Sequence, residues 1–161
     1  MKFIPGLLFL LCCAAVADTR KAPAERTDDA QWIEDLGGTV QRNAQGKVTS
    51  VNLRGTWVTD TDLRRLTDYA DLNELDLSLT HITDSGLQEL KNLRGITDFS
   101  LYFAEYVTDE GVASIKEWKR LKRLNLHGTK ASDTALEHIA GINTLESLDV
   151  GSTLMTDMGL E

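Results

Sequence analysis

The sequence from Val48 onward repeats itself with a nearly constant period, and this feature limits the possible folds more than any other. The segment LNELDLSLTHITDSGLQELKNLRG, which begins at Leu72, aligns with four other segments of the chain. The five copies begin at residues 48, 72, 96, 121 and 145, and the last copy is incomplete where the sequence stops at Glu161. A fixed period of about 20 to 50 residues is typical of a solenoid, in which each copy stacks on the next.

Each copy changes its hydrophobic periodicity once. In the second copy, Leu75 and Leu77 alternate with polar residues, which predicts a short strand with one buried face. Leu87 and Leu90 then lie three residues apart, as on one face of a helix. Before each helix stands a Thr-Asp or Ser-Asp pair, whose side chains can accept hydrogen bonds from the free N–H groups of the first helical turn. These pairs are Thr59-Asp60, Thr83-Asp84, Thr108-Asp109, Ser132-Asp133 and Thr156-Asp157.

One strand–loop–helix unit cannot bury its apolar side alone, so the units are expected to stack and align equivalent strand positions in one core. The first row is predicted to contain Val51, Leu75, Phe99, Leu124 and Leu148. The second row is predicted to contain Leu53, Leu77, Leu101, Leu126 and Val150. The residues between them, such as Glu74, Asp76 and Ser78, are predicted to point to the opposite, exposed face.

The pattern LxxLxLxxTxITDxGL over residues 48–161 resembles the leucine-rich repeat family, and looks like its ribonuclease-inhibitor-like and cysteine-containing-like subtypes. It is especially similar to secreted bacterial leucine-rich repeat proteins. The resemblance implies an α/β solenoid with a curved parallel sheet inside and helices outside, whose concave face binds proteins. It carries over no catalytic residue and no cofactor.

Two departures from the family pattern concern the loop after each strand. Thr56, Thr80, Thr129 and Thr153 stand where family members often have Cys or Asn, so hydroxyl groups are expected to satisfy the loop backbone. The third copy has Ala104 at this position and one extra residue, so its loop is predicted to bulge.

The residues before the repeats are predicted to form three segments. Residues 1–17 have a basic start at Lys2, an apolar run and a small-residue site ending at Ala17, which is the pattern of a secretory signal peptide. The apolar run is too short to span a bilayer. Residues 18–27 are predicted to be a flexible lead-in. Residues 28–47 are predicted to cap the first repeat, with Asp28 or Asp29 starting a helix and a hairpin turning near Asn43 to Gly46.

Both cysteines, Cys12 and Cys13, lie in the predicted leader. A mature chain that begins after Ala17 therefore has no disulfide, thiolate metal site or cysteine nucleophile. Lipid attachment at Cys13 is an alternative, but Cys12 is a poor match to the small residue that usually precedes such a site. The expected location is secreted, periplasmic or in the cell envelope.

The charge balance limits the classes of partner. The chain has 17 Lys and Arg residues against 25 Asp and Glu residues, a formal charge of −8. Phosphate binding needs clustered Lys and Arg, so nucleic acid and anionic membrane surfaces are not the expected partners. The sequence contains no P-loop, nucleophile-elbow, HExxH or EF-hand motif, and it gives no reason to expect a cofactor, a metal or catalytic residues.

An acidic cluster is expected on the exposed face of the strands, where Glu74, Asp76 and Asp98 lie near Arg123. A calcium site built from the three carboxylates is one alternative, and a hydrolase site that adds His127 is another. A solvated patch, partly neutralised by Arg123, is the favoured interpretation.

The best candidate for a binding surface is a group of large side chains just after the strands. Equivalent positions hold Gly55, Leu79, Phe103, Gly128 and Ser152, and small residues suit such a turn better than Leu79 and Phe103 do. Aromatic and Arg residues are typical of interface hot spots, and grouped apolar surface marks interaction sites. The candidates for partner binding are therefore Trp57, Leu79, Tyr102, Phe103, Arg54, Arg123 and His127.

The sequence therefore predicts an exported leucine-rich repeat module that binds a protein and has no catalysis of its own. Two alternatives remain open. The repeats are a segment of a longer structural solenoid at an envelope or surface, or the large side chains fold down over the loops as a second small core.

Overall fold

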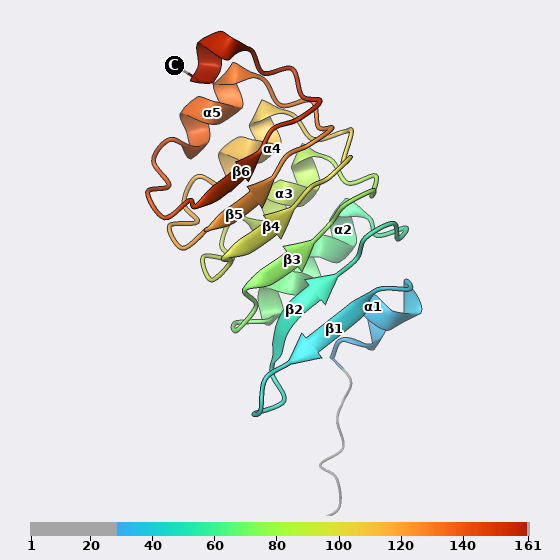
Figure 1. Ribbon diagram of the computed structural model, residues 1–161. Helices are drawn as coiled ribbons and strands as arrows, with labels where there is room; N and C mark the ends of the chain where they lie inside the picture. Colours follow the sequence, from blue (N-terminus) through green and yellow to red (C-terminus); the bar gives the residue numbers. More distant parts are fainter. Residues whose placement is uncertain (1–28, 161) are drawn as a thin grey trace, which may run out of the picture.

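A computed structural model describes residues 29–160, so the predicted leader, the lead-in and Asp28 lie outside the described residues. The described chain forms one six-stranded sheet in the order β1-β2-β3-β4-β5-β6, with the helices alongside it (Figure 1). The strands are β1 (Thr39–Arg42), β2 (Val48–Asn52), β3 (Glu74–Asp76), β4 (Asp98–Ser100), β5 (Arg123–Asn125) and β6 (Ser147–Asp149). The helices are α1 (Gln31–Asp35), α2 (Asp60–Leu63), α3 (Asp84–Leu90), α4 (Asp109–Ser114) and α5 (Asp133–Ile139), with 3-10 helices η1 (Arg64–Asp68) and η2 (Asp157–Leu160).

Strands β2 to β6 pair in parallel and in sequence order, which confirms the predicted fold class. Each of the strands β2 to β5 leads through a loop to a helix before the next strand begins, so the chain advances by one strand in every copy (Figure 1). The register confirms the first predicted row, whose paired residues are Val51, Leu75, Phe99, Leu124 and Leu148.

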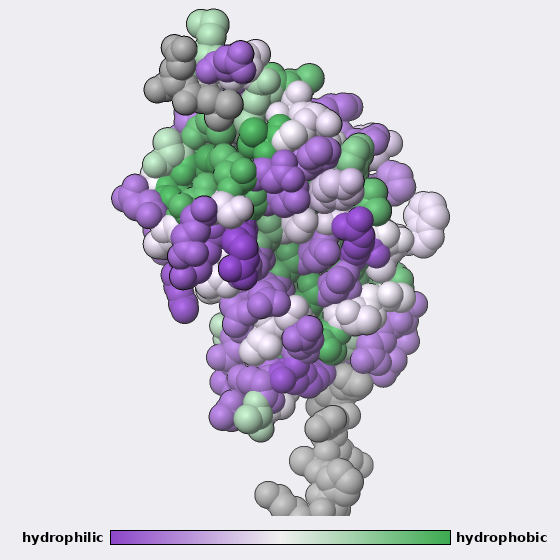
Figure 2. Space-filling model, viewed as in Figure 1, coloured by the Kyte–Doolittle hydropathy of each residue, from purple (hydrophilic) through white to green (hydrophobic). Residues whose placement is uncertain are grey.

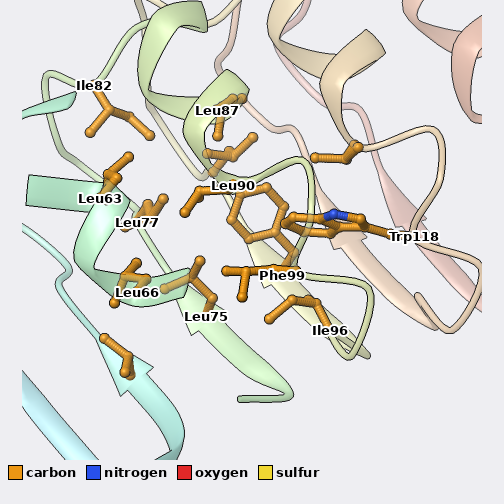
Figure 3. Packing of buried hydrophobic residues seen from close by; sticks show 14 of the residues in the cluster. Leu63, Leu66, Leu75, Leu77, Ile82, Leu87, Leu90, Ile96, Phe99 and Trp118 are labelled. Atoms are coloured by element: carbon orange, nitrogen blue, oxygen red, sulfur yellow. The ribbon is translucent and has the colours of Figure 1, made fainter. Parts of the chain in front are cut away.

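The hydrophobic core lies between the sheet and the helices. Leu75 of β3 is buried there with Leu87 and Leu90 of α3 (Figure 3). In the third copy, Phe99 packs edge-on against Trp118, with 5.1 Å between the ring centroids. The burial of these apolar side chains is the main favourable term in folding.

The last copy is less well covered than the others. Leu145 and Leu148 are only partly buried, whereas the equivalent Leu121 and Leu124 are buried. Figure 2 shows hydrophobic side chains gathered near α5 and β6, at this end of the sheet.

Within residues 29–160, no helix is both long enough and apolar enough to cross a bilayer.

The Thr-Asp and Ser-Asp pairs connect neighbouring copies. Thr83 caps α3, because its hydroxyl oxygen accepts the N–H of Ser85 at 3.2 Å. Asp84 instead accepts the backbone N–H and the hydroxyl of Thr108, in the next copy, at 2.8 and 2.7 Å. Of the two possible caps, the Thr therefore acts within its own copy and the Asp holds the next one. The other bridges of this kind join Asp60 to Thr83, Asp109 to Ser132 and Asp133 to Thr156.

The threonine hydroxyls close the loops after the strands, as predicted. Thr56, Thr80, Thr129 and Thr153 each donate to the backbone carbonyl three residues earlier, at 2.6 to 2.7 Å. Ala104 has no hydroxyl for this bond. In its copy the N–H of Val107 donates to the Ala104 carbonyl at 3.1 Å, and the turn presents Glu105 and Tyr106 to solvent. The extra residue of the third copy thus forms an outward turn.

The segment before the repeats covers the first of them. Trp32 and Ile33 of α1 are buried, and the Trp32 indole N–H donates to the Tyr69 hydroxyl at 3.0 Å. The Tyr69 hydroxyl in turn donates to the backbone carbonyl of Asp29 at 2.7 Å. Burial of the Tyr69 ring raises the pKa of its hydroxyl. These bonds join α1 to the first copy.

The hairpin before the repeats turns where the sequence predicts, but the start of α1 differs from the prediction. The side chain of Asn43 accepts two N–H groups of the turn at 3.0 Å, and Gly46 has a φ of +80°. The N-cap of α1 is Ala30, which makes no side-chain bond to the helix. The predicted capping role of Asp29 is therefore wrong, because its carboxylate lies 3.1 Å from Arg42 and forms an ion pair instead.

Candidate functional site

One turn position in every copy has a left-handed backbone. The φ angle is +66° at Gly55, +56° at Leu79, +54° at Phe103, +75° at Gly128 and +53° at Ser152. In this conformation a Cβ atom crowds the following carbonyl oxygen, which costs about 1–2 kcal/mol for residues other than Gly. Leu79 and Phe103 therefore keep large side chains where the backbone favours glycine.

The stacking of the copies holds this turn in place. The N–H groups of Gly55, Leu79, Phe103 and Gly128 each donate to a backbone carbonyl of the next copy, at 2.7 to 2.9 Å. The parallel hydrogen-bond ladder thus continues beyond the strands into the turns. Leu79 and Phe103 cannot relax to another conformation without breaking these bonds. Strain that the surrounding structure maintains is common at functional sites.

Rings gather beside the strand ends in a group that we call the inner cluster, namely Arg54, Tyr102, Phe103 and His127. The Tyr102 ring meets Phe103 edge-on at 4.7 Å and stacks over His127 at 5.2 Å, measured between centroids. The guanidinium carbon of Arg54 lies 5.2 Å from the Tyr102 centroid, which is a cation–π distance. His127 also places Nδ1 3.4 Å from Asp149 Oδ1.

Phe103 lies over the turn of the fourth copy rather than in the core. A Cβ atom on Gly128 would come within 2.9 Å of the Phe103 ring, so the glycine makes room for it. Phe103 is half-buried in this position, whereas Leu79 is 46% exposed. The alternative of a second small core over the loops therefore describes Phe103 in part and Leu79 not at all.

A second line of side chains follows the buried Thr or Ala position in four successive copies. We call it the outer row, and it contains Trp57, His81, Tyr106 and Lys130. The rings of Trp57 and His81 stack at 5.7 Å with planes 8° apart, and His81 lies 5.8 Å from Tyr106. Lys130 Nζ lies 5.8 Å from the Tyr106 centroid. Trp57 is 80% exposed and Tyr106 is 50% exposed, so the row is open to solvent.

A hollow of about 200 Å³ lies between the inner cluster and the outer row. A second hollow, of about 310 Å³, lies beside Trp57 and His81. The inner cluster, the outer row, Leu79 and Glu105 together form one surface, which we call the rim. The side chains that line the first hollow are Leu79, Thr80, His81, Phe103, Glu105 and Tyr106.

The face of the sheet opposite the helices forms a groove of about 620 Å³. Its acidic residues are Glu74, Asp76, Asp98 and Asp149, and Arg123 forms an ion pair with Asp98. Among residues 29–160, no group of three or more His, Cys, Asp or Glu side chains is placed to hold a metal ion. The carboxylate that His127 contacts is Asp149, not one of the predicted cluster of Glu74, Asp76 and Asp98.

Several polar residues of the groove have structural roles that the sequence did not reveal. Asn52, Asp76, Asn125 and Asp149 each accept, through Oδ1, the backbone N–H two residues later at 2.8 to 3.0 Å. Ser78 is fully buried, and its hydroxyl lies 2.8 Å from that of Ser100. Its predicted exposure is wrong because β3 ends at Asp76, so strand alternation no longer applies two residues later.

The structure brings together some of the predicted binding residues and separates others. Four of the seven form the inner cluster, and Leu79 lines the hollow beside it. Trp57 lies in the outer row, where its ring contact is with His81. Arg123 lies at the start of β5, on the groove, where it pairs with Asp98. The predicted group is therefore two ring assemblies and one separate ion pair.

Sequence reasoning missed four residues of the rim, namely His81, Glu105, Tyr106 and Lys130. A partial signal was available, because aligning the copies on their Thr position places Trp57, His81 and Lys130 in one column. Tyr106 is displaced from that column by the extra residue of the third copy. Its place in the ring stack depends on the turn that this residue forms.

Comparisons with known proteins agree with this architecture. Residues 70–91 match the family model described as Leucine Rich repeat. No curated protein matches the chain. Among solved structures, the chain is similar to an internalin (inlF) from Listeria monocytogenes, with 19% identity, 81% of this chain and 44% of that chain covered, and a TM-score of 0.53.

Two further solved structures share the fold. Internalin C2 (inlC2) from Listeria monocytogenes has 25% identity, with 69% of this chain and 55% of that chain covered and a TM-score of 0.51. Pollen Receptor Kinase 3 has 16% identity, with 72% of this chain and 56% of that chain covered and a TM-score of 0.53. The chain spans about half the length of these solved chains. The matched segment identifies a leucine-rich repeat at residues 70–91, and the shared architecture shows that the fold is a leucine-rich repeat solenoid.

Proposed function

We propose that the chain is an exported binding module that takes a protein partner on its rim and performs no catalysis of its own. The observation that carries this proposal is the pair of left-handed residues, Leu79 and Phe103. Strain of this kind costs about 1–2 kcal/mol per residue. Neither side chain belongs to the hydrophobic core, so neither recovers this energy there. Contact with a partner would bury the parts of these side chains that the fold leaves exposed.

The residue types of the rim also favour a protein partner. Trp, Tyr and Arg are the types most enriched at interface hot spots. The rim presents Trp57, Tyr102, Tyr106 and Arg54 within two neighbouring ring assemblies. Large rings contribute apolar contact area at low conformational cost, and the exposed Trp57 has most of its surface available for it.

The groove lies next to the rim, because His127 of the inner cluster contacts Asp149 of the groove. Glu74 on its floor is exposed and has no ion-pair partner within residues 29–160. Arg123 and Asp98 already neutralise each other there. The rim therefore supplies affinity, and the acidic floor of the groove supplies specificity by disfavouring acidic segments of a partner there.

The export part of the proposal rests on residues 1–17. Their basic start, apolar run and small residues before Asp18 fit cleavage after Ala17. Mass spectrometry of the exported protein is expected to find a mature chain beginning at or next to Asp18. Folded exported protein that keeps Met1 would contradict this part without affecting the binding surface.

Partner capture tests the binding part. Wild-type protein is compared with a Trp57→Ser/Phe103→Gly variant, in which glycine suits the left-handed turn at 103, and with Arg120→Glu as a charge-changing control at an exposed site outside the rim. We expect wild type and control to retain a protein from the exported fraction, and the double variant to lose it by at least about tenfold. Equal retention by all three proteins would exclude the rim as the binding site.

A further inference from the structure

We propose that the partner segment bound by the rim is acidic and inserts one bulky apolar side chain into the hollow. This inference rests on the proposed function and adds the chemistry of the partner. The occupant is a segment in which an aromatic or branched aliphatic residue is flanked by Asp or Glu. The apolar residue contacts the walls of the hollow, and the flanking carboxylates pair with Arg54 and Lys130.

The hollow sets the size and polarity of the inserted group. Its volume is about 200 Å³, which is below the roughly 300–1,000 Å³ of pockets that enclose whole small molecules. A space of this size suits one large side chain. The rings of His81, Phe103 and Tyr106 and the aliphatic Leu79 bound it, so the inserted group gains most by being apolar.

Two cations of the rim contact rings near the hollow, Arg54 from the first copy and Lys130 from the fourth. Arg54 belongs to the inner cluster and lies over Tyr102, while Lys130 ends the outer row and lies near Tyr106. Within residues 29–160, neither forms an ion pair. Ring contacts position both groups, and no carboxylate of the described residues neutralises their charge.

Among residues 29–160, some basic residues on other surfaces are neutralised and others, such as Arg94 and Arg120, are not, so the feature that distinguishes Arg54 and Lys130 is their place beside the rings of the rim. Arg42, Lys47, Lys122 and Arg123 each pair with a carboxylate. The rim has one carboxylate, Glu105, against Arg54 and Lys130, in a chain whose formal charge is −8. Unpaired cations held beside an apolar hollow therefore select an acidic apolar segment by charge complementarity.

The groove defines where such a segment cannot lie. The groove floor is acidic because of Glu74, Asp76 and Asp149. The ion pair of Arg123 neutralises the charge of Asp98 but not the charges of these three residues. An acidic segment in the groove would meet like charges, which disfavour a wrong partner or a wrong position. The segment is therefore expected to follow the rim, along the line of Arg54, the hollow and Lys130. Replacing Glu74 by Lys should not weaken its binding.

Selection from a phage-displayed random peptide library tests the inference without a known partner. The library is selected on four proteins: wild type, Arg54→Glu/Lys130→Glu, Phe103→Gly and the Arg120→Glu control. Thermal melts first establish that each variant is folded. We expect wild type and the control to enrich peptides with an aromatic or branched aliphatic residue next to Asp or Glu. Synthetic copies of these peptides should bind the double charge variant at least about tenfold more weakly, and binding to wild type should weaken as salt rises.

The outcomes separate this inference from the proposed function. If the enriched peptides are basic or uncharged but their binding requires Phe103, the inference is overturned and the proposed function still holds. Peptides that bind the Phe103→Gly protein as well as wild type, or no enrichment on any protein, would count against the rim as a binding site and overturn both. Acidic apolar peptides that lose affinity in the double charge variant and not in the control support the inference.

Discussion

Two rows of equivalent residues run through the solenoid, two positions apart in every copy. They differ in the physical factor that explains which residue types they contain. The core row is apolar throughout and fully buried in its first four members, whereas the turn row mixes glycine, serine, leucine and phenylalanine in one left-handed conformation. Burial explains every residue of the core row. Backbone geometry explains Gly55 and Gly128 in the turn row, but it disfavours Leu79 and Phe103. The core row is Leu53, Leu77, Leu101, Leu126 and Val150, and the turn row is Gly55, Leu79, Phe103, Gly128 and Ser152.

The largest expected effect tests the core row. Leu77→Ala removes a fully buried side chain and should lower the free energy of unfolding by about 2–5 kcal/mol, from lost burial and the cavity left behind. Glu74→Ala, at an exposed position of the same copy, should change it by no more than about 0.5 kcal/mol. Asp76→Ala lies between them at about 1 kcal/mol, because its carboxylate accepts the N–H of Ser78. Denaturant melts in which Glu74→Ala costs as much as Leu77→Ala would overturn the strand register.

The next effect tests the two glycines of the turn row. Gly55→Ala meets open space, so it should cost only the left-handed strain, about 1 kcal/mol. Gly128→Ala adds a contact with the Phe103 ring and should cost about 2–3 kcal/mol. In the Phe103→Gly background this extra cost should disappear. A double-mutant cycle from denaturant melts measures the coupling, and a value near zero would mean that Phe103 does not lie over Gly128.

A smaller effect of opposite sign tests the strained leucine. Leu79→Gly removes the left-handed strain and little buried surface, because the side chain is 46% exposed. The change should leave the free energy of unfolding unchanged or raise it by up to about 1 kcal/mol. Leu77→Gly, two residues away in the core row, should be strongly destabilising. A clear loss of stability from Leu79→Gly would show that Leu79 supports the fold, and the case for a binding role would weaken.

The smallest effect concerns the aspartate bridges that join neighbouring copies at the starts of the helices. The backbone N–H and the hydroxyl of Thr156 donate to Asp133 and hold the pKa of its carboxyl below the usual value. Because the folded-state pKa is the lower one, the bridge stabilises the protein above the unfolded-state pKa, and this contribution is lost as the pH falls through the folded-state value. Asp133→Asn should therefore flatten the acid side of a stability–pH profile measured by thermal melts. An unchanged profile would show that the bridge does not form in solution.

Most of the fold could be predicted from the sequence because the repeat supplies the same information five times. The alternation of Leu75 and Leu77 predicted the strand, its register and its buried face. The role of Asp84 could not be predicted in this way, because the donors that it accepts belong to Thr108, 24 residues away. Its sequence neighbours suggest that it caps a helix. The bonds to Thr108 become possible only when the copies are stacked.

The candidate site could be predicted only in part, for a different physical reason. The unusual size of Leu79 and Phe103 is visible in the sequence, because equivalent positions can be compared. Which rings meet depends on loop conformation, and loops do not follow the strand or helix periods. Trp57 was therefore grouped with Tyr102, whereas its ring stacks on His81.

The three tryptophans differ in exposure, so tryptophan fluorescence can report whether a ligand covers the rim. Trp32 is 8% exposed and Trp118 is fully buried, whereas Trp57 is 80% exposed. Acrylamide should therefore quench the fluorescence of one indole strongly and leave the other two largely shielded. A molecule that covers the rim should shift the emission of Trp57 to shorter wavelength and protect it from the quencher, while a molecule bound elsewhere should change neither. Fluorescence titration of the unlabelled wild-type chain, with Trp57→Phe as the control, can therefore locate a ligand as well as detect it.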